Sequence, residues 1–178
     1  MRVHVERIKD SDLYLDFHEP ADHFAVLNTM IQSGECEFTD RIHVQLRLYR
    51  IHDMIEVEGT LTTGIRLPCG RCLNRYETPL NAEFALTYTR ELPEGQAEVV
   101  DLREEDIGMI VFHGDEIDLR DGIQEQVVLT FPFRPICREN CKGLCPQCGK
   151  DLNQGQCDCD RVDPAHPFAA LKKLKLDR

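Results

Sequence analysis

The residues of this chain best suited to chemistry are its cysteines. Six of the nine lie between Cys137 and Cys159, in the run C-R-E-N-C-K-G-L-C-P-Q-C-G-K-D-L-N-Q-G-Q-C-D-C. Four thiolates at such intervals can close a tetrahedral zinc site. A further pair, Cys69 and Cys72, stands alone in the sequence C-G-R-C. In a reducing compartment such paired clusters are more often metal ligands than disulfides, so the sequence predicts bound zinc.

The spacing favours two structural sites with four cysteines each. The first would join the isolated C-G-R-C pair to the start of the tail and consist of Cys69, Cys72, Cys137 and Cys141. The second would lie within the tail and consist of Cys145, Cys148, Cys157 and Cys159. Cys36 would then stand outside both sites. An alternative allocation places Cys137, Cys141, Cys145 and Cys148 around one ion, and the sequence does not decide between the two.

Neither of the two four-cysteine sites offers a catalytic position. An ion with four cysteine ligands has no open place for water, so we expect both zinc ions to be structural. The seven histidines are scattered, and the chain has no G-x-S-x-G, P-loop or dinucleotide-binding fingerprint. We therefore expect a protein that is not an enzyme and has no small-molecule substrate.

A thiol redox function of Cys69 and Cys72 is an alternative. In thioredoxin-like enzymes the C-x-x-C motif follows a strand and opens a helix. Here strand-like sequence flanks the motif on both sides, which disfavours that interpretation.

Much of the chain before the tail has the period-two pattern of antiparallel strands. Apolar and polar residues alternate over 42–48 and again over 55–67, with a turn at His52 and Asp53 between them. A third strand is expected around 84–89. Shorter strands are expected at 3–8, 13–17 and 110–112. Such a sheet exposes one face to solvent, and its apolar face must be covered by other elements of the fold.

Two stretches have the spacing of helices that could provide this cover. Residues 22–32 repeat apolar side chains at helical intervals and end before Gly34. Residues 117–130 do the same, with Asp118 as a candidate cap and Pro132 as the stop.

The elements together predict an α+β fold. Residues 1–134 would form a mainly antiparallel β body with one or two covering helices. Residues 135–178 would form a zinc-knuckle tail that packs on the body as one unit and ends in a short helix over 167–176. Charged residues interrupt the first twenty positions and no apolar run approaches about 20 residues, so we expect no signal peptide or membrane span and a cytoplasmic protein.

The formal net charge of −11 is unevenly distributed. Residues 134–178 hold nine Lys or Arg against six Asp or Glu, so they carry +3 and residues 1–133 carry −14. The segment 91–125 is especially acidic and is typical of a solvated connector.

Seven basic residues flank the cysteine motifs: Arg66, Arg71, Arg75, Arg134, Arg138, Lys142 and Lys150. If the first site joins the two regions, these residues would form a basic patch that could contact RNA phosphates. Alternatively, they would only offset the charge of the thiolates.

Five short motifs follow one another from residue 69 onward. They are C-G-R-C-L at 69–73, G-D-E-I-D-L at 114–119, C-K-G-L-C-P-Q-C-G at 141–149, D-L-N at 151–153 and P-F-A-A-L at 167–171. In this order they resemble the YceD family, the large ribosomal RNA subunit accumulation proteins. One departure is visible, because many relatives have D-P-R where this chain has Asp163, Pro164 and Ala165. The resemblance implies a part in processing or accumulation of large-subunit ribosomal RNA, with no established enzymatic reaction.

Three functions follow from these patterns. The first is an assembly factor whose basic patch contacts the precursor of the large-subunit ribosomal RNA. The second is a chaperone or adaptor that holds a basic ribosomal protein on the acidic face. The third is a thiol redox protein that uses Cys69 and Cys72.

Overall fold

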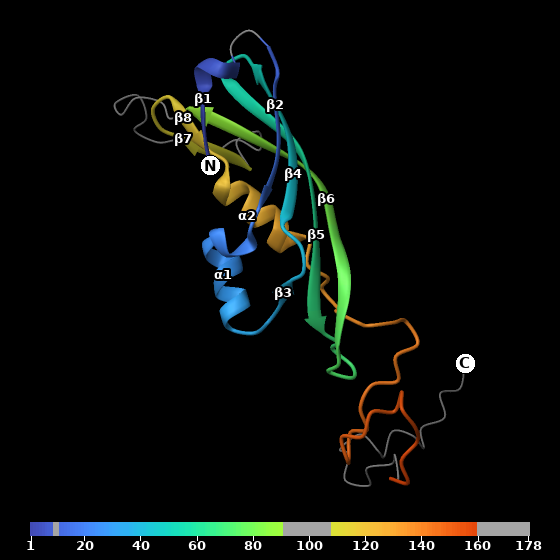
Figure 1. The fold of residues 1–178 in the computed structure, drawn as a ribbon. Coiled ribbons are helices and arrows are strands. Elements are labelled where there is room, and N and C mark those ends of the chain that lie inside the picture. Colours follow the sequence, from blue (N-terminus) through green and yellow to red (C-terminus); the bar gives the residue numbers. More distant parts are fainter. Residues whose placement is uncertain (9–10, 91–107, 160–178) are drawn as a thin grey trace, which may run out of the picture.

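A long antiparallel sheet forms the body of the protein (Figure 1). The computed structural model describes residues 1–8, 11–90 and 108–159. Residues 91–107 of the acidic segment and the helix expected over 167–176 lie outside these residues. The neighbouring strands of the sheet are, in order, β2 (Leu13–Glu19), β4 (Ile42–Ile51), β5 (Met54–Pro68), β6 (Arg75–Arg90) and β7 (Met109–Phe112). A short strand, β3 (Glu37–Phe38), also pairs with β5, and β7 runs parallel to β6.

The two long hairpins follow from the alternation in the sequence. Strands β4 and β5 are joined through the expected turn, where Ile51 faces Met54 and His52 has a positive φ of 55°, as tight hairpin turns require. The strand expected around 84–89 is the end of the 16-residue strand β6. Strands β5 and β6 stay paired as far as Pro68 and Arg75. The C-G-R-C motif therefore lies in the loop at the tip of this hairpin.

Two helices pack against one face of the sheet, and the predicted α+β fold is confirmed. Helix α1 (Ala25–Gln32) buries Leu27, and helix α2 (Arg120–Leu129) buries Ile123 and Val127. They meet where the backbone N–H of Val26 donates to Oε1 of Gln124 at 2.8 Å. The inward residues of β4 are Ile42, Val44, Leu46 and Leu48, all 0–3% exposed.

The first expected strand, 3–8, is only partly correct. Strand β1 (Arg2–His4) ends early and a 3-10 helix, η1 (Val5–Ile8), follows. Strand β1 pairs with β8 (Glu116–Asp118), so that Val3 lies opposite Ile117. This pairing buries both apolar side chains.

The two helices begin later than predicted. The helix expected from residue 117 starts at Arg120, because Ile117 is held in the β1–β8 pair. Asp118 still contributes to the start of the helix, since its Oδ1 accepts a hydrogen bond from Arg120 N at 3.0 Å. The helix expected from residue 22 starts at Ala25, because a 3-10 turn, η2 (Ala21–His23), comes first.

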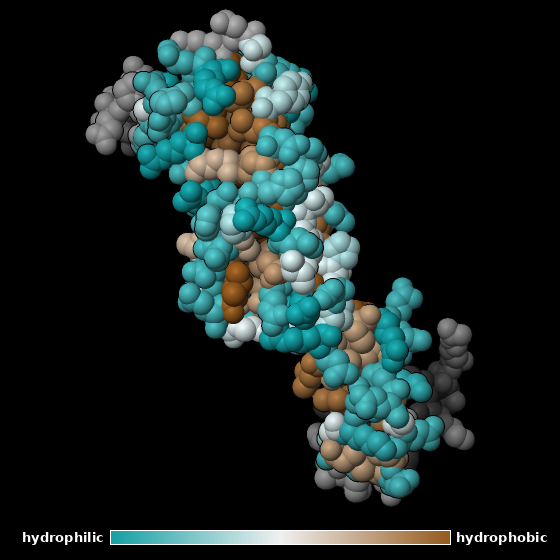
Figure 2. All heavy atoms as spheres, in the orientation of Figure 1, coloured by the Kyte–Doolittle hydropathy of each residue, from teal (hydrophilic) through white to brown (hydrophobic). Residues whose placement is uncertain are grey.

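The cysteine-rich tail continues past the tip of the β5–β6 hairpin (Figure 1). Figure 2 shows a mostly hydrophilic face that narrows between body and tail, with hydrophobic side chains gathered at the narrow part. We call the stretch 133–142, which leads from the body into the tail, the neck. The division of the chain at residue 134 stays a prediction. Among the described residues, no helix is long and apolar enough to cross a membrane.

Gly122 brings helix α2 close to strand β6. A Cβ atom at this position would lie 2.7 Å from Cδ1 of Leu86 and 2.8 Å from the hydroxyl oxygen of Tyr88. Helix propensity alone favours alanine over glycine by about 1 kcal/mol, whereas overpacking a buried contact costs about 1 to 3 kcal/mol. We expect Gly122→Ala to lower the free energy of unfolding in urea, followed by circular dichroism. A variant more stable than the native chain would contradict this packing.

Candidate metal centres

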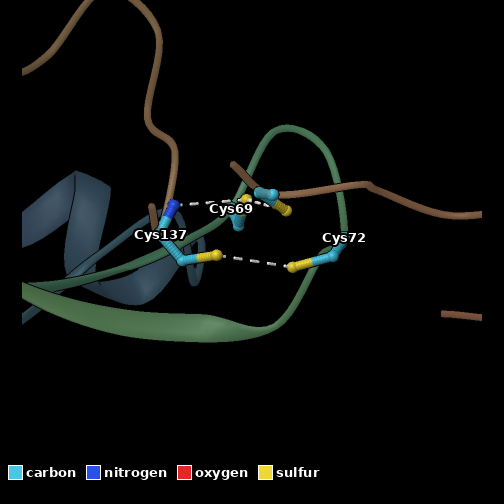
Figure 3. A group of neighbouring side chains, drawn as sticks. Cys69, Cys72 and Cys137 are labelled. Carbon is cyan, nitrogen blue, oxygen red and sulfur yellow. Dashed lines mark hydrogen bonds between the residues drawn. The ribbon is translucent and has the colours of Figure 1, made fainter. Parts of the chain in front are cut away.

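The first cluster joins the body to the tail through four sulfur atoms. Figure 3 shows Cys69 and Cys72, on the loop of the β5–β6 hairpin, facing Cys137 from the tail. The Sγ atoms of Cys72 and Cys137 are 3.8 Å apart, and those of Cys69 and Cys141 are 3.9 Å apart. A tetrahedral ion with metal–sulfur bonds of about 2.3 Å separates its sulfurs by about 3.8 Å. The four sulfurs lie within 4.8 Å of one another and could hold such an ion.

This first cluster is well shielded from water. Cys69 is 0% exposed, and Cys72 and Cys141 are each 4% exposed. The partly buried side chains of Tyr76, Ile136 and Leu144 pack against it. A shielded site of this kind strengthens interactions between a cation and thiolates, because the surrounding medium screens them poorly.

Backbone N–H groups prepare the first cluster for a cation. The N–H groups of Arg71 and Cys137 each donate to Sγ of Cys69 at 3.4 Å. Burial acts to raise the pKa of Cys69, but hydrogen bonds from the backbone of Cys72, Cys137 and Arg71 outweigh it and lower the pKa to about 6. Burial and the neighbouring sulfurs raise the pKa of Cys137 to about 12. Hydrogen bonds from Asn153 and from the backbone of Gly143 also lower the pKa of Cys141 against the effect of burial. The four sulfurs therefore differ in how readily they lose their protons, and a divalent cation would replace the protons that remain.

The second cluster lies entirely in the tail. Its four sulfurs also lie within 4.8 Å of one another and belong to Cys145, Cys148, Cys157 and Cys159. Backbone N–H groups of Cys148 and Gln147 are the main cause that lowers the pKa of Cys145 to about 6. The pKa of Cys159 is raised to about 12. The neighbouring Cys148 sulfur is the largest cause, and burial is the second. Cys148 is exposed, so this second cluster is the more open of the two.

A polar bridge connects the two clusters. Asn153 Nδ2 donates to Sγ of Cys141 at 3.4 Å, and Asn153 Oδ1 accepts from the backbone N–H of Lys142 at 2.9 Å. Asp151 accepts from Asn153 Nδ2 at 2.7 Å and from Asn74 Nδ2, on the hairpin loop, at 2.8 Å. The segment between the ligands of the second cluster thereby supports a ligand of the first.

Close backbone contacts hold the tail on the hairpin tip. Gly143 has a φ of 74°, and a Cβ atom there would lie 2.9 Å from the carbonyl oxygen of Arg71. This glycine lets Leu144 N donate to that oxygen at 3.0 Å. The Arg71 guanidinium in turn donates to the carbonyl oxygens of Glu139 and Cys141, at 3.2 and 2.9 Å.

The structure groups the eight cysteines as in the first allocation, and not around Cys137, Cys141, Cys145 and Cys148. All nine cysteines are free of disulfide bonds. Cys36 lies in the core of the body at 0% exposure, outside both clusters, and burial raises its pKa. The C-G-R-C motif is flanked by β5 and β6, so it lacks the strand-to-helix context of a redox motif.

The seven basic residues of the predicted patch have different surroundings. Arg66 pairs with Glu37 and Glu77, and Arg75 pairs with Glu37 at 2.7 Å. As described above, Arg71 binds the backbone of the tail.

The other basic residues lie in the neck and tail. Lys150 Nζ donates to the carbonyl oxygen of Gln156 at 2.7 Å. Arg134, Arg138 and Lys142 are exposed, and within the described part of the chain their side chains form no ion pair.

Sequence reasoning missed several residues that build this region. Asn74, Asp151 and Asn153 are polar residues beside or between cysteines, and nothing in their spacing predicted that they join the two clusters. Phe133 was also missed, although it is 96% exposed at the neck. The signal that could have identified Phe133 is its place in the proline-rich stretch F-P-F-R-P, which leads into the tail.

Comparisons with known proteins agree with the motif pattern. A family model described as "Large ribosomal RNA subunit accumulation protein YceD" matches residues 57–175. An uncharacterized protein of Mycobacterium leprae is 32% identical over 130 residues, which cover 71% of this chain and 52% of that protein.

A plant relative is also similar to this chain. It is the Arabidopsis thaliana protein named large ribosomal RNA subunit accumulation protein YCED homolog 1, chloroplastic, and is 28% identical over 156 residues, 75% of this chain and 48% of that protein. The chain spans about half the length of the curated relatives that it matches. No solved structure matches the chain.

The difference in exposure predicts that the clusters lose metal in a fixed order. We expect the zinc-loaded protein to hold two ions, and a chelator to remove the ion at the second cluster first, because Cys148 is exposed whereas three cysteines of the first cluster are buried. Native mass spectrometry during a chelator titration would measure this. Cys148→Ser should destabilise only the easily removed ion, and Cys141→Ser only the retained one. A single bound ion, or simultaneous loss of both, would contradict the assignment.

Proposed function

Because the chain belongs to the YceD family of large ribosomal RNA subunit accumulation proteins, we propose that it supports accumulation of large-subunit ribosomal RNA by binding the precursor RNA directly. The resemblance inferred from the short motifs is thereby confirmed as membership. The matched residues 57–175 include both cysteine clusters and the neck. These shared elements are where the RNA contact is proposed.

The stretch 133–142 carries this proposal. Phe133 is 96% exposed and directly precedes the exposed Arg134. Arg138 and Lys142 follow, each next to a cysteine of the first cluster. Proteins that bind single-stranded RNA combine cations that contact phosphates with aromatic side chains on which bases stack. This stretch offers both kinds of contact on a surface that the first cluster holds in place.

We propose that zinc occupies both clusters and has a structural role. Four cysteine sulfurs in a tetrahedral arrangement suit zinc, and they leave no coordination position for water or substrate. On this proposal the protein is not an enzyme. Turnover of a disulfide substrate by the zinc-loaded protein would contradict it.

The charge on the neck predicts a salt-dependent RNA affinity. We expect the triple variant Arg134→Gln, Arg138→Gln and Lys142→Gln to bind precursor large-subunit RNA more weakly. The slope of log affinity against log salt should fall by about 2, because each lost phosphate contact removes about 0.7 to 0.9 from it. Fluorescence anisotropy at several salt concentrations would measure both quantities.

A second triple variant serves as a control with the same change in charge. It consists of Arg41→Gln, Arg66→Gln and Arg75→Gln, of which the last two are already paired with Glu37. Arg41 lies away from the tail, beside Thr39 and Asp40. The control should retain the native salt slope. Equal slopes for both triple variants would contradict the proposed surface. Arg71 is unsuitable for this test, because its removal would also loosen the tail.

Phe133 predicts a contact of a different kind. We expect Phe133→Ala to weaken binding of single-stranded precursor RNA by about 1 to 3 kcal/mol through loss of base stacking, with an unchanged salt slope. The variant should be as stable as the native chain, because the side chain is 96% exposed. Unchanged RNA affinity would show that Phe133 has no part in binding. Leu129→Ala, at a position that is 69% exposed on helix α2, provides a control that removes exposed apolar surface elsewhere.

A further inference from the structure

Strands β7 and β8 lie at the end of the body away from the tail (Figure 1), and they border a second candidate site. It is a pocket of about 460 Å³ between helix α2, strand β7 and strand β8. Strand β7 is at the edge of the sheet. Residues that line the pocket include Tyr88, Ile110, Phe112 and Gly122. A volume of this size accommodates a side chain or small ligand.

Carboxylates give this pocket a negative charge. Glu116 and Asp118 lie on one side and already interact with Arg2, at 3.8 and 3.6 Å. Asp121 and Glu125 lie on the other side, one turn apart on helix α2. Both are exposed, and neither side chain forms a hydrogen bond or ion pair with another residue in the described part of the chain. Two like charges at this spacing repel each other, so a cation between them would be favourable.

The hydroxyl group of Tyr88 is a second, independent sign of a ligand. Tyr88 is 1% exposed, and its buried hydroxyl has no hydrogen-bond partner within residues 1–8, 11–90 and 108–159. Native proteins seldom leave a buried polar group unpaired, because the lost hydration is not replaced. The hydroxyl lies below Gly122, where a Cβ atom would be only 2.8 Å away. Burial, together with the charges of Asp118, Asp121 and Glu125, raises the pKa of Tyr88 to about 12, so the group stays neutral and can accept a hydrogen bond.

We propose that this pocket binds the guanidinium group of an arginine side chain from a basic partner protein. A guanidinium is planar and has five N–H donors, so it can reach several acceptors at once. Asp121, Glu125 and the oxygen of Tyr88 are acceptors in this pocket for which the described residues supply no partner. The apolar side chains of Ile110 and Phe112 suit the aliphatic part of an arginine.

A single metal ion fits this pocket less well. Among the described residues, its carboxylates do not form a group with oxygens within 4.8 Å of one another, unlike the cysteine clusters. Arg2 shows that the opposite rim already accepts a guanidinium. Strands β7 and β8, which border the pocket, lie at the opposite end of the body from the tip of the β5–β6 hairpin (Figure 1), so this inference does not rest on the proposed RNA contact.

Binding of arginine peptides to the zinc-loaded full chain, without RNA, tests the proposal. The probe is a fluorescent peptide of alternating arginine and glycine, and the readout is anisotropy. The pair Asp121→Asn and Glu125→Gln should weaken binding about tenfold. The pair Asp22→Asn and Asp53→Asn changes the net charge equally at exposed positions outside the pocket, and should weaken binding less than about twofold. Equal losses for the two pairs would overturn the proposal.

Tyr88→Phe separates binding from folding. This variant removes only the unpaired hydroxyl, so its melting temperature should not fall. Its affinity for the arginine peptide should nevertheless decrease several-fold. Unchanged affinity would overturn the assignment of the hydroxyl to the site, and so would a loss of affinity that merely follows a loss of stability.

Two further measurements identify the ligand and its position. A peptide of alternating lysine and glycine, spermidine and magnesium ions should each compete poorly with the arginine peptide, because none presents a planar fork of donors. Equal competition by any of them would overturn the specificity for arginine. In nuclear magnetic resonance spectra, the amide of Gly122 should shift when the arginine peptide is added. A shift confined to the cysteine-rich tail would place the binding elsewhere and overturn the proposal.

Discussion

The arrangement of the tail depends on the convergence of four sulfur atoms from two distant parts of the chain. Cys72 and Cys137 are separated by 65 positions, and Cys69 and Cys141 by 72, yet both pairs are in contact. Four thiolates at such distances repel one another strongly in a buried site. The cluster can therefore exist with protons on some of its sulfurs or with a cation among them. A bound cation would link the tip of the β5–β6 hairpin to the tail, where hydrogen bonds already connect them.

The sequence predicted the elements whose signals are local. The alternation over 42–48 and 55–67 is sufficient to identify β4 and β5, because one face is buried over 42–48 and, except at Gly59, over 55–67. The cysteine spacing also suggested the two groups of sulfurs that the structure brings together, although the sequence left two allocations open. Strand β8 was not predictable in this way. Ile117 suits a buried strand as well as a helix, and only its pairing with Val3, more than a hundred residues away, decides between them.

Long-range contacts also give the basic residues of the predicted patch surroundings that the sequence did not indicate. Arg66 and Arg75 are close to cysteines in sequence, but β3 places Glu37 opposite Arg66 across the sheet. Their charges are thereby largely balanced within the body. Nothing in the sequence around the two-residue strand β3 indicated this pairing. In the neck and at the start of helix α2, by contrast, exposed charged side chains have no ion-pair partner within the described residues.

The position of the stretch 133–142 makes metal binding and the proposed RNA contact interdependent. Gly70 N donates to the carbonyl oxygen of Pro135 at 2.7 Å, and Arg71 binds the carbonyl oxygen of Cys141. Between these anchors, Cys137 and Cys141 belong to the first cluster, and Arg138 and Lys142 directly follow them in the sequence. An ion that orders these cysteines also fixes the backbone of the neighbouring basic residues. Metal binding would then supply the free energy needed to order this stretch. RNA would bind a surface that is already ordered, so its own binding would not include this entropic cost.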